Sequence, residues 1–130
     1  LYVEDHCRAI LAVLQKGQIG ETYNVGGNSE KQNIEVVQTI CDILDEKVAR
    51  LASGEARRSL IKFVKDRAGH DRRYAIDASK IKNDLGWEPS VVFTDGIRST
   101  VDWYLQNGEW IDAVLDGSYR EYYQKMYEGR

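Results

Sequence analysis

The feature that most constrains this sequence is a helical repeat of apolar residues that begins after Asn33. Spacings of three and four residues place such side chains on one face of an α-helix, so the segment is predicted to be an amphipathic helix. Asn33 stands where this helix begins and is a favoured N-cap residue. Helix N-termini also favour phosphate, so a cap and an anion contact can coincide at this position. The apolar stripe consists of Ile34, Val36, Val37, Ile40, Cys41 and Leu44.

Several further segments combine helical spacing with residues that start or stop a helix. Capping side chains accept hydrogen bonds from the first turn, and glycine or proline ends the helical path. The first predicted helix is capped by Asp5, stops at Gly17 and Gly20, and carries Cys7, Ile10, Leu11 and Leu14. A second is capped by Asp77, carries Ile81 and Leu85, and stops at Gly86, with Pro89 beyond. A third is capped by Thr94 or Asp95 and carries Ile97, Val101, Tyr104 and Leu105, and the tail, 109–130, is predicted to be helical in two pieces split at Gly117.

Three short apolar runs are predicted to be extended: "LYV" at 1–3, "ETYNV" at 21–25 and "LIKFV" at 60–64. A sheet made only of these strands would be small, with long unpaired edges. The strands would fit better as extensions of a larger sheet outside this sequence. The predicted fold class is therefore α/β, helix-rich, with few short strands.

Size and charge restrict the kinds of function that the chain can have. Its 130 residues are 42% hydrophobic and 30% charged, which suits one soluble domain over residues 1–130. A net charge of −3 argues against a broad nucleic-acid surface. No apolar run has membrane-spanning length and no signal peptide is present, so a cytoplasmic protein is the simplest expectation. The sequence begins at Leu1 without a methionine, and we interpret it as the middle of a longer protein.

The residues alone indicate no complete catalytic centre. We find no nucleophile paired with a base, no paired catalytic carboxylates and no metal-ligand pattern. Cys7 and Cys41 lie in apolar helical patterns and are predicted to be buried thiols. "NVGGN" at 24–28 lacks the G-x-G-x-x-G spacing and is better interpreted as a strand end that turns into a loop. His6 is expected to be a surface histidine on the first turn of its helix.

The stretch "DRAGHDRRY" at 66–74 concentrates hydrogen-bond donors around one glycine. The guanidinium of Arg67 could bind a diphosphate, His70 could donate to a phosphate or a sugar, and Gly69 would let the backbone approach a ligand. In the alternative interpretation the arginines only form surface ion pairs. These pairs would join Arg67, Arg72 and Arg73 to Asp66, Asp71 and Asp77. Both interpretations remain open from the residues alone.

The aromatic residues near the C-terminus follow helical spacing, and packing is their expected role. They are Tyr119, Tyr122, Tyr123, Met126 and Tyr127.

Five blocks in order give the sequence a more specific resemblance: "LYVEDHCRAI", "GETYNVGGNSEKQNIEVV", "DRAGHDRRYAIDASKIKNDLGWEP", "GIRSTVDWYL" and "YEGR". Together they resemble the C-terminal part of the dTDP-glucose 4,6-dehydratases, which belong to the extended short-chain dehydrogenase/reductase superfamily. The resemblance covers nearly the whole chain. It diverges most in 49–62, where a surface connection is expected to vary.

The resemblance implies that this chain is the substrate-binding portion of such an enzyme. Asn33 would contact the dTDP portion, Arg67 the diphosphate, and His70 would help to hold the nucleotide. Tyr127 matches the tyrosine of the family's terminal block. Asp66 and Gly69 belong to the same Asp-Arg-Pro-Gly-His segment, and Ala68 replaces its proline. The loop therefore loses a fixed φ but keeps its donors.

The resemblance also places the family's chemistry outside this chain. The full-length enzymes bind NAD on an N-terminal Rossmann domain, which supplies the glycine fingerprint and the catalytic residues, and they are usually dimers. One diphosphate-binding arginine would also precede Leu1. We therefore expect no catalytic, NAD-binding or metal-binding residues here, and no activity from the chain alone. Two alternatives remain: a stand-alone module that binds nucleotide sugars without catalysis, and a fragment of a related nucleotide-sugar epimerase or dehydratase.

Overall fold

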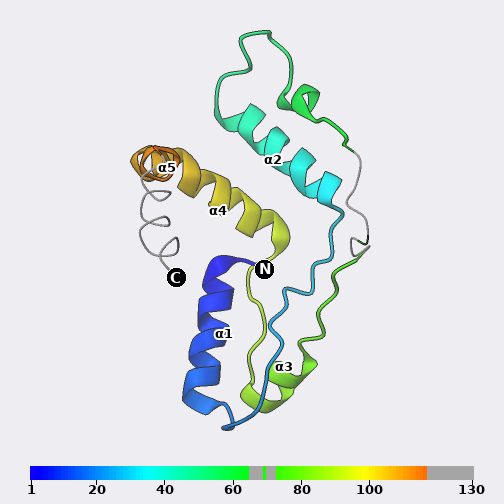
Figure 1. Cartoon of the computed structure of the whole chain (residues 1–130), viewed down its shortest axis with the longest axis vertical. Helices are drawn as coiled ribbons and strands as arrows, with labels where there is room; N and C mark the ends of the chain where they lie inside the picture. The colour runs from blue at the N-terminus through cyan, green and yellow to red at the C-terminus, as the bar shows by residue number, and fades with distance from the viewer. Residues whose placement is uncertain (65–68, 70–72, 117–130) are drawn as a thin grey trace, which may run out of the picture. The chain divides into compact units, whose positions relative to one another are not determined.

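Helices make up the regular structure of the part of the chain that the computed structural model describes, residues 1–64, 69 and 73–116, and no strand occurs there. The chain divides into two compact units, residues 1–98 and 99–130. Within the described ranges, no helix is long and apolar enough to cross a membrane. The elements are α1 (Val3–Lys16), α2 (Asn33–Lys47), the 3-10 helix η1 (Arg57–Leu60), α3 (Ser79–Leu85), α4 (Phe93–Gln106) and α5 (Gly108–Leu115) (Figure 1).

The core of residues 1–98 forms where α1 packs against α3. Ala9 of α1 and Ile81 of α3 have no exposed surface. Complete burial of a side chain such as Ile81 stabilises the fold by about 1.5–3 kcal/mol. The remaining core residues are Ala78, Leu85 and Trp87, with Ala12, Val13, Tyr23 and Val25 packed around them.

A buried carboxylate joins α1 to the chain that follows α3. Asp5 has no exposed surface. Its Oδ1 accepts a hydrogen bond from the Ser90 amide at 3.0 Å, and its Oδ2 accepts one from the Val91 amide at 2.9 Å. Arg8, one turn later on α1, donates to Oδ1 at 2.6 Å. Burial alone would raise the pKa of Asp5, but these hydrogen bonds outweigh it and hold the pKa well below its ordinary value.

Two arginines hold η1 against α2. Arg57 donates from its backbone amide and its guanidinium to Asp45, at 2.9 and 2.6 Å. Arg58 donates from Nε to Asp42, one helical turn earlier, at 2.6 Å. The backbone and side-chain hydrogen bonds from Arg57 lower the pKa of Asp45. The side-chain hydrogen bonds from Arg58 lower the pKa of Asp42. Ion pairs and hydrogen bonds, rather than buried apolar side chains of η1, therefore hold η1 against α2.

In the second unit, aromatic rings pack where α4 meets α5. The ring centroids of Trp103 and Trp110 lie 5.2 Å apart at an interplanar angle of 72°, an edge-to-face arrangement. Tyr104 lies 5.3 Å from Trp103 in the same manner. The side-chain amide of Asn107, between the helices, donates to the Trp103 carbonyl at 2.7 Å and so satisfies the end of α4.

The structure confirms most of the predicted helices. α2 covers the apolar stripe, and Gly17 follows the last residue of α1. Gly86 ends α3 with a left-handed φ of 69°. α5 corresponds to the first piece of the predicted tail, whereas the second piece lies outside the described residues. The helix-rich part of the predicted fold class is therefore confirmed.

The predicted strands are wrong within the described residues. Val3 is already helical, and Leu60 belongs to η1. Residues 21–25 are extended but form no ladder. Short β-prone runs need partner strands for their backbone groups, and the described residues supply none. The α/β class itself remains a prediction.

Several caps were also predicted wrongly, by one to three residues. α1 starts after Tyr2, because the Asp5 side chain turns to residues 90 and 91 instead of capping its own helix. Gln32 precedes α2, so Asn33 is its first helical residue. α4 begins at Phe93, before both of its predicted caps, Thr94 and Asp95.

Cys7 was predicted to be buried and is instead exposed, whereas Cys41 is half-buried. Cys7 lies on a face of α1 that also carries the exposed Val3, Ile10 and Leu14. Helical spacing identifies an apolar face but not whether these residues cover it. His6 is exposed, as expected.

Asp5→Asn is expected to destabilise the protein by about 2–4 kcal/mol, because an amide NH2 would face a buried backbone N–H. Urea unfolding followed by circular dichroism measures the loss. Asp84→Asn, the same substitution at an exposed aspartate of α3, serves as the control. A loss for Asp5→Asn no larger than that for Asp84→Asn would contradict the role of the buried carboxylate.

The contribution of Asp5 to stability is expected to depend on pH. Its folded-state pKa lies below the unfolded value, which is about 3.9 for aspartate, so the folded state binds fewer protons. The stabilisation is therefore complete above the unfolded pKa and is lost as the pH falls toward the folded pKa. The difference in urea midpoint between the parent and Asp5→Asn should shrink from pH 7 to pH 3. A constant difference would contradict the lowered pKa.

Candidate functional site

Two segments without regular structure, residues 21–30 and 73–78, lie side by side and run in opposite directions, and the second leads into α3 (Figure 1). At one end Glu21 pairs with Lys80, whose ammonium also lies 4.9 Å from the ring centroid of Tyr23. At the other end Glu30 pairs with Arg73. Side-chain contacts, rather than a backbone ladder, therefore join the segment that leads into α2 with the segment that follows "DRAGHDR".

Asn33 is the first residue of α2 and is exposed. The turn around it is held locally, because the Gln32 amide donates to Oε2 of Glu35 at 2.8 Å. Lys31 lies 3.9 Å from the same carboxylate. Asn33 is thus presented to solvent from a turn with a defined backbone.

Gly69 is the second predicted site residue that the structure describes. Its φ of 71° lies in the left-handed region, which disfavours residues with a Cβ. Nothing lies within 4 Å of the position that a Cβ would occupy. Backbone conformation, rather than close packing, therefore requires glycine here. The other predicted site residues, Asp66, Arg67, His70 and Tyr127, lie outside the described residues.

The alternative interpretation of the arginines can be examined at two positions. Arg73 does form a surface ion pair, but with Glu30, 43 residues away, instead of a nearby aspartate. Asp77 accepts a hydrogen bond from the amide of Ser79, the first residue of α3, at 2.8 Å. The sequence reasoning missed the Glu30–Arg73 pair, since no local pattern signals a contact at that separation.

The glycines of "NVGGN" pack against other parts of the chain. A Cβ on Gly26 would lie 3.1 Å from Cγ2 and 3.2 Å from the carbonyl oxygen of Ile76, and one on Gly27 would lie 3.0 Å from Cα of Leu1. These glycines thus allow close approach between segments of the chain.

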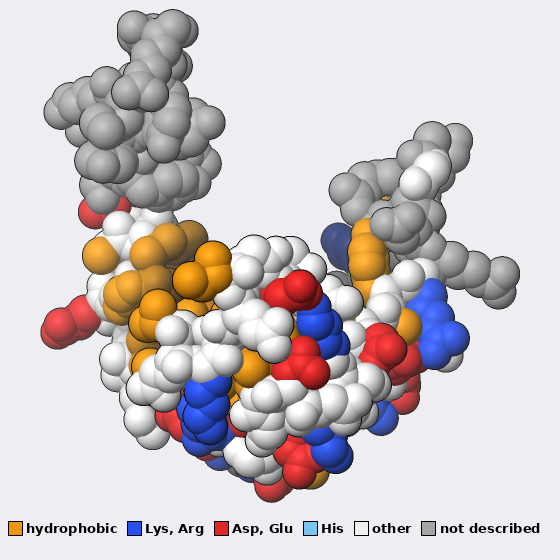
Figure 2. Space-filling model, turned by 90° about the horizontal axis from the view of Figure 1, so that it is seen from below, with side chains coloured by type: hydrophobic (Ala, Val, Ile, Leu, Met, Phe, Trp, Pro, Cys, Tyr) orange, Lys and Arg blue, Asp and Glu red, His pale blue; other side chains and the backbone are white. Residues whose placement is uncertain are grey.

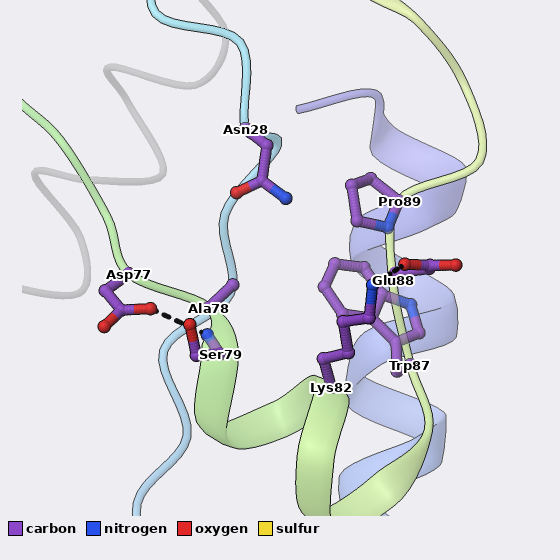
Figure 3. A pocket seen from close by; sticks show the side chains of 8 residues that line it. All are labelled: Asn28, Asp77, Ala78, Ser79, Lys82, Trp87, Glu88 and Pro89. Carbon is purple, nitrogen blue, oxygen red and sulfur yellow. Dashed lines mark hydrogen bonds and ion pairs between the residues drawn. The ribbon is translucent and has the colours of Figure 1, made fainter.

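A pocket beside α3 has an empty volume of about 320 Å³, including open solvent (Figure 3). Its charged groups are already engaged, because Lys82 pairs with Glu88 at 2.6 Å and Asp77 accepts from the first residue of α3. It therefore lacks the free cation that an anionic ligand would need. Neither Asn33 nor Gly69 is among its lining residues, which are Asn28, Asp77, Ala78, Ser79, Lys82, Trp87, Glu88 and Pro89.

Basic and acidic side chains lie next to one another on the face drawn in Figure 2. Ion pairs of this kind include Lys80–Glu21, which lowers the pKa of Glu21 through the hydrogen bond from the ammonium. Such neighbouring opposite charges form no broad basic surface for a nucleic acid.

Residues 1–100 match the model of a family described as GDP-mannose 4,6 dehydratase. The chain belongs to this family. It is 64% identical over 120 residues, 92% of its length, to a dTDP-glucose 4,6-dehydratase of Xanthomonas campestris. It is 55% identical over all 130 residues to dTDP-glucose 4,6-dehydratase 1 of Escherichia coli. The resemblance inferred from the five sequence blocks is confirmed.

Solved structures of this family's members agree with the sequence relatives. A dTDP-glucose 4,6-dehydratase from Bacillus anthracis in complex with NAD is 49% identical, with a TM-score of 0.69 over 85% of this chain and 32% of that one. DesIV, the dTDP-glucose 4,6-dehydratase from Streptomyces venezuelae with NAD and TYD bound, is 41% identical, with a TM-score of 0.70 over 82% of this chain and 30% of that one. The chain spans about a third of the length of the curated relatives that it matches: 34% for Xanthomonas and 35% for Escherichia.

Gly26→Ala is expected to destabilise the protein by about 1–3 kcal/mol, because the new methyl group would press on Ile76, including its carbonyl oxygen. Gly108→Ala is the matched control: Gly108 is the first residue of α5, and nothing lies within 4 Å of the position that its new methyl group would take. Thermal unfolding should show a lower midpoint only for Gly26→Ala. Equal midpoints for the two variants would contradict the close contact between residues 26 and 76.

Proposed function

We propose that this chain is the substrate-binding C-terminal portion of a dTDP-glucose 4,6-dehydratase. Such an enzyme eliminates water from dTDP-glucose and gives dTDP-4-keto-6-deoxyglucose. The observation that carries the proposal is the similarity, over nearly all of the chain, to enzymes that bear this name. The nucleotide sugar would be the ligand of this portion.

In this proposal the ligand binds between the start of α2 and the stretch 66–70. Asn33 would contact the dTDP portion, and its exposure at the first turn of a helix supports this role. Arg67 would bind the diphosphate and His70 would hold the nucleotide. The left-handed backbone at Gly69 supports a special loop conformation here. Asp66 and Tyr127 would complete the site, Tyr127 through the family's terminal block.

The catalytic residues are proposed to lie outside this chain, in a Rossmann domain of the longer enzyme. NAD, bound there, would accept a hydride from the sugar and return it after water has left. The chain alone would be inactive, the intact enzyme would be a homodimer, and its compartment would be the cytoplasm.

Exposed apolar residues on α1 support a larger assembly. Leu14 is 81% and Val3 is 62% exposed, although α1 already buries its opposite face against α3. A helix that is apolar on two faces is normally covered on both. The rest of the longer enzyme is the proposed cover for this second face.

Arg67→Ala in the intact enzyme is expected to raise the KM for dTDP-glucose about tenfold or more and to lower kcat less, because the lost contact holds the diphosphate rather than the reacting carbon atoms. Steady-state kinetics with varied dTDP-glucose measures both constants. Arg50→Ala, which removes an exposed arginine elsewhere in the chain, is the control and should leave the KM unchanged. An unchanged KM for Arg67→Ala would overturn the assignment of Arg67 to the diphosphate.

A further inference from the structure

Three successive contacts join segment 21–30 to segment 73–78 and the first turn of α3. Glu21 pairs with Lys80 at one end, and Gly26 packs against Ile76 in the middle. The pair between Glu30 and Arg73 forms the last level before the first segment enters α2. This pair therefore connects the approach to α2 with the segment that follows the 66–72 stretch.

The geometry of this last contact is directional. Nε of Arg73 donates to Oε2 of Glu30 at 2.8 Å, and the terminal Nη2 donates to the same oxygen. Two donors of one planar guanidinium restrict the orientation of the carboxylate more than a lysine would. The side chains are 70% and 51% exposed, so the pair adds little to global stability. Its effect is local, on the backbone three residues before Asn33.

The charge of Glu30 has a second consequence at this position. A free carboxylate three residues from Asn33 would repel the diphosphate of a nucleotide sugar bound there. Arg73 neutralises that carboxylate, while the other carboxylate near the start of α2, Glu35, accepts from the Gln32 amide and lies 3.9 Å from Lys31. Loss of Arg73 would therefore both release the turn and uncover a repelling charge.

We propose that Glu30 and Arg73 are a positioning pair for nucleotide-sugar binding, which orients the turn that presents Asn33 and cancels a negative charge beside it. This inference rests on the proposed function, since it assumes that Asn33 contacts the ligand. Neither residue needs to touch the ligand. The pair acts on the KM for dTDP-glucose and leaves the chemical step unchanged.

The test measures KM and kcat for dTDP-glucose in the intact enzyme with Arg73→Gln, Glu30→Gln and the double variant. Arg73→Gln should raise the KM roughly three- to tenfold, with kcat within about twofold of the parent, because only binding is affected. Glu30→Gln should raise the KM less, since it removes the repelling charge together with the contact. The KM of the double variant should fall from the value for Arg73→Gln to the value for Glu30→Gln. Such rescue would not follow from a merely structural role.

The matched control is Glu21→Gln, which breaks the ion pair with Lys80 at the far end of the same two segments. It should leave the KM near the parent value. The inference is overturned if Arg73→Gln does not change the KM, if Glu21→Gln raises it equally, or if the double variant is worse than Arg73→Gln. If Arg73→Gln does not fold, Arg73→Lys replaces it; this variant keeps the charge but loses the fork, and its KM should still rise.

Arg67→Ala, measured in the same series, separates this inference from the proposed function. If Arg67→Ala raises the KM and Arg73→Gln does not, the positioning pair fails while the proposed binding site stands. If neither variant changes the KM, both fail.

Discussion

The structure of residues 1–98 depends on the buried carboxylate of Asp5. The chain after α3 has no regular structure at residues 90 and 91, so its amide groups there need acceptors from elsewhere. Asp5 supplies both oxygens, and Arg8 balances the charge. Because this contact ties the end of the α3 segment to the first turn of α1, it holds together the two helices whose side chains form the core. An apolar residue at this position would leave the amides of Ser90 and Val91 without these acceptors.

Segments 21–30 and 73–78 show how the chain can hold two neighbouring segments together without a sheet. Ion pairs at both ends and a glycine contact in the middle replace the backbone ladder. Such contacts are individually weak in water, so they determine the alignment of the segments more than their stability. Each contact sets the alignment near it, so only the Glu30–Arg73 end bears on the turn before α2. The segment from residue 21 leads to Asn33, and Arg73 follows the 66–72 stretch.

The sequence predicted local features well and distant partners poorly. The stripe from Ile34 to Leu44 and the stop at Gly86 depend on neighbours within one or two turns, and the structure confirms both. Asp5 was predicted to cap its own helix. Nothing nearby in the sequence shows that its side chain accepts a hydrogen bond from an amide 85 residues away, that of Ser90. The expected strands failed for the same reason, since a strand exists only with its partner.

The candidate site shows the same contrast between residues that belong to a sequence motif and residues that are joined only by a distant contact. Resemblance to a family predicted Asn33 and Gly69 as site residues, and both stay predictions. The structure places Asn33 at the first turn of α2 and gives Gly69 a left-handed φ. Resemblance did not identify Glu30 or Arg73, because a positioning pair has no motif of its own. Its signal is geometric, a contact between two segments that each lead to a proposed ligand-binding residue.

The exposed face of α1 links the fold to the proposed function. Burial of Ala9 against α3 accounts for one side of the helix, but Val3, Ile10 and Leu14 remain exposed on another. Apolar surface of this kind costs free energy in water, and a covering partner would recover it. The curated relatives are about three times as long as this chain, which covers 34–35% of them, so they contain enough polypeptide to provide that cover. In that arrangement α1 would be covered on both faces, and the contacts of Asp5 would hold it in place for its cover.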